Sequence, residues 1–121
     1  MAAYLYDAGL FLLGGVFAWV GIEHFLRFET IAAQLAEQDF PAPRLLLAAG
    51  SIVEIIAGVC LAAGFAVPFA AAALIVFTIA ANMLVLTFWR HSGPQRQGLR
   101  SAFIVNFAVV GGLLAVAAGA R

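Results

Sequence analysis

Charge is scarce in this chain: only 10% of its 121 residues are Asp, Glu, Lys or Arg, and lysine is absent. Soluble globular domains carry about 25% charged residues, so the composition excludes that class. Without a basic stripe, a nucleic-acid interface is excluded too. The single cysteine, Cys60, excludes an intrachain disulfide and a CxxC redox relay. What remains is apolar, with 65% hydrophobic residues and a mean hydropathy of +1.09.

The apolar residues are grouped into runs long enough to cross a membrane. Spanning the hydrocarbon core of a bilayer takes about 20 helical residues. The qualifying runs are residues 8–28, 45–64, 67–89 and 101–119. The sequence therefore predicts one membrane domain over residues 1–121, an all-α four-helix transmembrane bundle with antiparallel up-down topology. Asp7 can cap the first helix and Pro68 can start the third.

The links between the predicted helices differ in character. In the first link, residues 29–43, Ile31 and Leu35 lie four apart among polar residues. This pattern fits a short interfacial helix, and a solvated loop is the open alternative. The segment RHSGPQRQGLR, residues 90–100, is polar and contains Gly and Pro, so it is predicted to be a loop.

Arginine positions predict the orientation in the membrane. With an even number of spans, the two longer links share one side and both termini share the other. The link side carries Arg27, Arg44, Arg90, Arg96 and Arg100, whereas the terminal side carries Arg121. By the positive-inside rule, the arginine-rich links are cytoplasmic and the termini external, in a multi-pass protein of a bacterial inner membrane.

Four polar side chains interrupt the predicted spans: His24, Glu54, Asn82 and Asn106. At 1.5 Å per residue they lie about 6 to 14 Å from the cytoplasmic ends of their helices. Side chains lean toward the N-terminus of their own helix. Because the predicted helices alternate in direction, this brings the four side chains closer to one level in the membrane. We therefore expect one polar pocket that opens toward the cytoplasmic half. Its apolar walls are expected to come from Phe17, Phe25, Phe103 and Phe107.

Each polar residue also has a purely structural interpretation. Asparagine in a membrane often serves only as a hydrogen-bond partner between helices, contributing about 0.6 kcal/mol on average. Glu54 is harder to explain in this way, because an ionisable group at that depth costs about 2.5–3.5 kcal/mol on insertion scales. The two histidines, His24 in a span and His91 near a loop glycine, do not form a haem pair. No metal site and no cofactor within the chain are expected.

The same residues lie in motifs that resemble the DoxX family of small four-helix membrane proteins. The likeness covers nearly the whole chain and runs, in order, through GVFAWVGIEHF, FPAP, GSIVEIIAGVCLAAG, ANMLVLTFW and NFAVVGGLL. Many members have lysine at the position of His24 and an arginine near the N-terminus, and both are absent here. The resemblance implies a redox context, since some relatives are similar to the membrane subunit of a thiosulfate:quinone oxidoreductase and others accompany thiol-stress enzymes.

The leading functional hypothesis is an accessory or quinone-proximal subunit of an oxidoreductase system. Glu54, His24, Asn82 and Asn106 would bind a quinone headgroup or relay its protons, and electrons would come from a partner membrane or redox subunit, because the chain shows no redox centre. One alternative is a small proton-coupled transporter, which also fits a lone membrane glutamate. Another is a packing subunit of a larger membrane complex. Whether the chain is an enzyme stays open.

Overall fold

The computed structural model describes residues 2–119, and within that range the chain is helical with no strand. Arg121, which enters the predicted charge difference, lies outside the described residues. The elements are α1 (Ala2–Leu26), α2 (Phe28–Glu37), α3 (Pro43–Ala62), α4 (Val67–Leu84), the short 3-10 helix η1 (Phe88–Arg90) and α5 (Gly93–Ala118).

Four helical segments are long and apolar enough to cross a membrane: α1, α3, α4 together with η1, and α5. The prediction of four apolar membrane-spanning segments is therefore confirmed. The first link forms a helix, α2, rather than a plain loop. Its buried residues Ala32 and Leu35 pack with Leu47 of α3, so this helix has an apolar face against the bundle.

Several predicted boundaries are wrong. Helix α1 begins at Ala2, so Asp7 lies inside the helix and does not cap it. Helix α5 begins at Gly93, eight residues before the predicted start, so most of the polar segment predicted as a loop is helical. The reason is that proline at the second position of a helix needs no hydrogen-bond donor there. Pro94 thus starts the helix instead of breaking it.

The predicted span 67–89 agrees with the apolar segment Val67–Arg90, but within this segment α4 ends at Leu84 and residues 85–87 are not helical. The chain then forms η1, which turns two aromatic rings toward α5. The ring centroids of Phe88 and Trp89 lie 5.3 and 6.0 Å from that of Phe103, both edge-to-face. Such aromatic pairs stabilise a contact beyond their buried area, so they help to hold η1 against α5.

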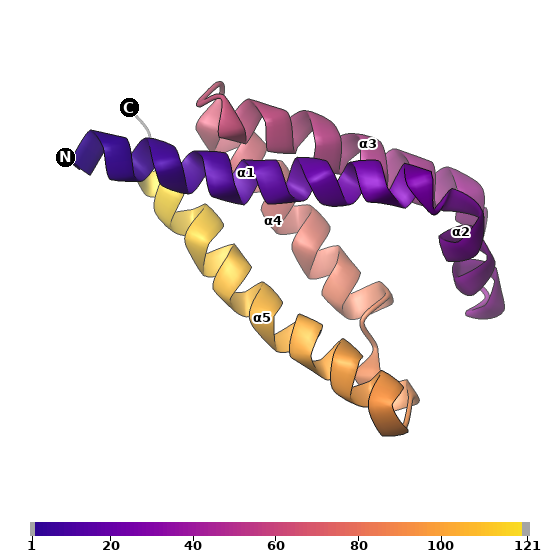
Figure 1. Ribbon diagram of the computed structural model, residues 1–121. Coiled ribbons are helices and arrows are strands. Elements are labelled where there is room, and N and C mark those ends of the chain that lie inside the picture. The colour runs from indigo at the N-terminus through magenta and orange to yellow at the C-terminus, as the bar shows by residue number, and fades with distance from the viewer. Residues whose placement is uncertain (1, 120–121) are drawn as a thin grey trace.

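The main core lies where α1, α3, α4 and α5 meet. Its fully buried side chains include Leu61, Leu74 and Leu113, and the half-buried Cys60 packs at its edge. At this end of the molecule α1 also contacts α5, where the Tyr6 hydroxyl donates a 2.6 Å hydrogen bond to the carbonyl oxygen of Val116. Toward the α4–α5 link, α4 and α5 diverge from the α1–α3 pair (Figure 1).

Helices α1 and α3 lie side by side along their length because glycine removes the side chains between their backbones (Figure 1). A Cβ atom on Gly58 would lie 2.7 Å from the backbone nitrogen of Ala18 and from the carbonyl oxygen of Gly14. A Cβ on Gly14 would collide with the backbone of Gly58 and Ala62. Backbone atoms cannot give way as a flexible side chain can, so both positions require glycine.

We expect Gly58→Ala to lower the free energy of unfolding by about 1–3 kcal/mol, the usual range for overpacking. Gly15→Ala is the matched control, because a Cβ at Gly15 meets nothing within 4 Å. Unfolding by sodium dodecyl sulfate, followed by circular dichroism in mixed micelles, measures both variants. Equal stability of the two variants would contradict the tight α1–α3 contact.

Candidate functional site

Glu54 is the most deeply buried ionisable side chain among the described polar residues, with 2% of its surface exposed. It lies on α3, on the face that packs against α1, and Ser51 precedes it by one turn with 1% exposed. A carboxyl group at this depth has lost its hydration. Its energetic cost must therefore be offset by a partner, a proton or a ligand.

The partner that the structure provides is His24 of α1. Its Nδ1 atom lies 3.0 Å from Glu54 Oε1 and 3.2 Å from Ser51 Oγ. The hydrogen bond is formed with Ser51, either donated by an Nδ1–H group or accepted from the hydroxyl when the proton is on Nε2. The His24 side chain is 27% exposed, so it connects the buried carboxyl group with the surface of the bundle.

The Oε1 atom of Glu54 accepts no hydrogen bond in the described structure, although His24 is close to it. The Nδ1 atom forms its hydrogen bond with Ser51 Oγ, and its contact with Glu54 Oε1 does not have the geometry of a hydrogen bond. A buried acceptor without a donor costs about 1–3 kcal/mol, more when charged. In native proteins such atoms are rare and call for a specific explanation. The Oε1 atom of Glu54 can therefore accept a hydrogen bond from a donor outside the described chain.

Gly21 positions the two side chains. It lies one turn before His24, and a Cβ there would be 2.7 Å from Ile55 Cγ1 and 3.2 Å from Glu54 Cβ. The absence of a side chain lets the α1 backbone approach α3 at the level of the carboxyl group. This close approach brings His24 within ion-pair distance of Glu54.

The two asparagines form a separate pair between α4 and α5. Asn106 Nδ2 donates a 2.7 Å hydrogen bond to Asn82 Oδ1, and Asn82 Nδ2 donates a 3.2 Å bond to the carbonyl oxygen of Phe103. Asn82, which is 6% exposed, therefore uses both ends of its amide group. This geometry is that of a bond that joins two helices, and each polar atom of the Asn82 side chain has a partner within the chain.

The two polar pairs lie at different heights in the bundle. Gly50 of α3 faces Phe77 of α4, since a Cβ on Gly50 would lie 3.2 Å from the Phe77 ring. Glu54 is four residues nearer the α3–α4 turn than Gly50, and Asn82 is five residues farther from it than Phe77. At the helical rise, this separates Glu54 from Asn82 by about 13 Å along the helix axes.

Within residues 2–119 no hydrogen bond or ion pair joins the two pairs. The structure thus brings His24 to Glu54 and Asn82 to Asn106, and a single pocket formed by all four side chains stays a prediction. The four phenylalanines are also spread out. Phe17 packs at the edge of the main core, and Phe25 stacks on Phe28 with the ring centroids 5.9 Å apart. Phe103 and Phe107 pack edge-to-face on α5.

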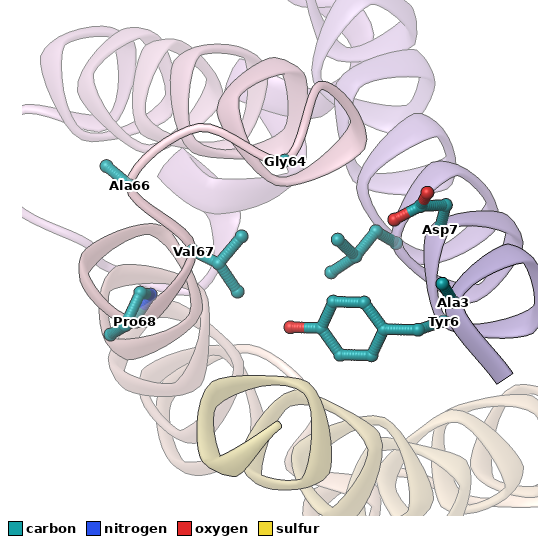
Figure 2. Close-up of a pocket in the computed structure, with 8 residues that line it drawn as sticks. Ala3, Tyr6, Asp7, Gly64, Ala66, Val67 and Pro68 are labelled. Atoms are coloured by element: carbon teal, nitrogen blue, oxygen red, sulfur yellow. The ribbon is translucent and has the colours of Figure 1, made fainter. Parts of the chain in front are cut away.

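Two hollows of the described chain lie away from both pairs. One, with a volume of about 330 Å³, lies at the start of α1. Figure 2 shows Tyr6 and Asp7 there, facing the α3–α4 turn at Gly64 to Pro68. Tyr6 is 18 residues before His24, so this hollow lies about 27 Å from the Glu54 pair along α1. The other lies on the first turns of α5.

Two polar residues near these positions are not among the predicted site residues. Ser51 lies three residues before Glu54, a spacing that places both on one helix face, and this is the signal that could have revealed it. Thr78 is 3% exposed, and its Oγ1 atom also lacks a hydrogen-bond partner. Within residues 2–119 no three His, Cys, Asp or Glu side chains gather as a metal site. The His24–Glu54 pair suits hydrogen bonding and proton transfer.

The structural role of the asparagines predicts a measurable coupling. In a double-mutant cycle of Asn82→Ala and Asn106→Ala, we expect a coupling energy of about 0.6 kcal/mol, up to about 1.7 kcal/mol, as for other hydrogen bonds between membrane helices. Unfolding in mixed micelles provides the four free energies. A cycle that pairs Asn106→Ala with His24→Ala is the control and should show no coupling. Coupling of similar size in both cycles would contradict the separation of the two pairs.

Comparison with known proteins gives one match. A family model described as DoxX matches residues 8–91, which cover most of α1 and all of α2 to α4, with His24, Glu54 and Asn82. No curated protein and no solved structure matches the chain. The resemblance drawn from the motifs is confirmed, and it agrees with four helices that are able to cross a membrane. The chain is a multi-pass membrane protein that belongs to the DoxX family.

Proposed function

We propose that this protein is an accessory or quinone-proximal subunit of an oxidoreductase system, with the His24–Glu54 pair as the place where a quinone headgroup is bound or its protons are relayed. The observation that carries the proposal is the Oε1 atom of Glu54, buried beside His24 without a hydrogen-bond donor. The hydroxyl group of a quinol supplies such a donor, and a protonated Glu54 donates in turn to a quinone carbonyl oxygen.

His24 is partly exposed and Glu54 is buried, which supports proton transfer from His24 to Glu54 during quinone reduction. Reduction of a quinone to a quinol takes up two electrons and two protons. His24, with its side chain 27% exposed, can exchange protons with water or headgroups, and its Nδ1 atom lies 3.0 Å from the buried carboxyl oxygen. Protons pass from His24 to Glu54 and then to the quinone oxygen, and the reverse order applies to quinol oxidation.

The electrons come from a partner in this proposal. The chain has one cysteine, and the described residues contain no cluster able to hold a metal ion. A chain of this composition can hold the headgroup and its protons, whereas a second membrane or redox protein must exchange the electrons. The protein is then one component of an assembly in the lipid bilayer.

The proposed topology is an antiparallel up-down bundle in a bacterial inner membrane. Contacts of Gly14 with Ala62 and of Gly21 with Ser51 fit two helices that run in opposite directions. Five arginines lie around the two longer links: Arg27, Arg44, Arg90, Arg96 and Arg100. By the positive-inside rule these links face the cytoplasm, the termini are external, and His24 opens toward the cytoplasmic side.

A proton-coupled transporter is the alternative that the same pair of residues favours, because a buried carboxyl group that exchanges protons through a histidine suits either activity. The two functions differ in what reaches Glu54. A subunit of an oxidoreductase binds a quinone headgroup there, whereas a transporter moves protons together with a solute across the bilayer.

The test is quinone binding by Glu54 variants in nanodiscs. We expect Glu54→Leu to weaken binding of a short-chain quinol at least about tenfold, since a lost hydrogen bond to a charged group is worth about 1.5–3 kcal/mol. Glu54→Gln should bind within about tenfold of the original protein, yet lose quinone-linked proton uptake, because an amide cannot release a proton. Calorimetry measures binding and a pH indicator follows the protons.

Glu37→Gln, the same substitution on the exposed end of α2, is the matched control and should leave binding and proton uptake unchanged. The proposal is wrong if the protein binds no quinone, or if Glu54→Leu binds as well as the control. Solute uptake driven by a proton gradient in proteoliposomes, lost in Glu54→Gln, would favour the transporter instead.

A further inference from the structure

The charges of this chain are divided between its two halves. All six acidic residues lie within residues 1–54, together with only two arginines, Arg27 and Arg44, which gives a net charge of −4. Residues 55–121 contain four arginines and no acid, which gives +4. Although the net charge of the whole chain is zero, its second half is therefore basic. Within the described residues, this positive charge lies in the α4–α5 link and at the start of α5.

Three arginines mark this region: Arg90 at the end of η1, and Arg96 and Arg100 on α5. Arg96 and Arg100 are four residues apart and lie on one helix face. With Gly93, Pro94 and Gln97 they line a surface hollow. We call Arg96 and Arg100 with this hollow the α5 arginine face.

The two guanidinium groups of this face are without an acidic partner. Among residues 2–119 the acid–base contacts within ion-pair distance are His24 with Glu54 and Arg44 with Glu29, and neither involves α5. Arg44, by contrast, has an acidic partner: its Nη1 atom donates hydrogen bonds to both carboxylate oxygens of Glu29, at 2.7 and 2.6 Å. Arg96 only packs over the Phe88 ring, with Cζ 5.6 Å from the ring centroid.

The position of the face along the chain sets its level in the bilayer. The α5 arginine face follows directly after the apolar span Val67–Arg90 and lies at the beginning of the next span, Gly93–Ala118. Trp89, 48% exposed, lies at the end of the first of these spans and packs against Phe103. Tryptophan at the end of a span marks the interface of a membrane, where lipid phosphates lie.

We propose that the α5 arginine face binds the phosphate group of an anionic phospholipid. A guanidinium group presents a planar fork of donors that matches phosphate oxygens, and two such groups one turn apart can hold one headgroup. The hollow offers room between them, and the cation–π contact with Phe88 fixes the stem of Arg96. The inference is independent of the quinone proposal, because it concerns other residues on other helices.

A lipid fits this face better than a second copy of the chain. The acidic residues of another copy that could reach it lie around α2, where Glu29 is already held by Arg44 and only Glu37 and Asp39 are left. Phosphate, by contrast, surrounds the face at high density in any bilayer that positions Trp89 at the interface. Basic clusters next to a span attract anionic headgroups, with about a fivefold preference per arginine.

The test uses Trp89 as a local reporter. The protein has two tryptophans, so Trp19→Phe leaves Trp89 alone. Trp19 is 56% exposed on the surface of α1, so its replacement removes no core contact. This protein is reconstituted into vesicles of phosphatidylcholine with brominated phosphatidylglycerol or with brominated phosphatidylcholine, and quenching of Trp89 gives the local enrichment of each lipid.

We expect the anionic lipid to be enriched about 25-fold over the zwitterionic one, from two arginines at about fivefold each. Arg96→Gln with Arg100→Gln should lower the ratio by about this factor and leave only the preference contributed by Arg90. Replacement of both residues by lysine should retain part of the preference, because lysine keeps the charge without the fork of donors. Arg27→Gln, the same loss of charge on another link, is the matched control and should keep the ratio.

Equal quenching by both lipids in the unchanged protein overturns the proposal, and so does an equal loss in the Arg27→Gln control. If the double glutamine variant instead changes the oligomeric state, and does so equally in neutral and anionic vesicles, the face binds a second copy and the proposal is wrong. Helix content by circular dichroism shows that each variant is folded before quenching is interpreted.

Discussion

The close contact between α1 and α3 is the constraint on which the rest of this structure depends. Glycine at three positions, Gly14, Gly21 and Gly58, removes the side chains that would hold these helices apart. In a membrane, where burial of apolar side chains gives little preference for one helix neighbour over another, close backbone packing is the main source of specificity. The same contact brings the partly exposed ring of His24 to the buried carboxyl group of Glu54.

The polar groups inside the bundle have two different roles, which hydrogen bonding distinguishes. Asn82 is satisfied at both ends of its amide, so it stabilises the α4–α5 contact. Glu54 has an oxygen with no donor, although burial makes that costly. A chain under selection for stability alone would have no reason to keep such a group. The absence of a hydrogen bond to this oxygen therefore supports a ligand or a proton at this position, which the proposed function supplies.

The proposed lipid binding by the α5 arginine face follows from the uneven distribution of charge along the chain. With the acids confined to the first half of the chain, the arginines of α5 have no acidic residue of their own half as a partner. Around α2, Arg44 and Glu29 neutralise each other. The two longer links would then differ in their counter-charges. The arginines at the α2 link have acidic side chains of the chain itself nearby, whereas those at the α4–α5 link are neutralised by anionic lipid headgroups.

The sequence by itself determined the class of protein, its four apolar spans, its family and the unusual position of Glu54, because hydropathy, span length and motif order are local properties of the chain. Only the tertiary structure decided that α4 ends early, that α5 begins at Gly93, and that the polar residues divide into two pairs. Helix spacing predicts which residues share a face. It does not predict which faces meet, since that depends on how closely neighbouring backbones approach, and this is what the glycines between α1 and α3 set.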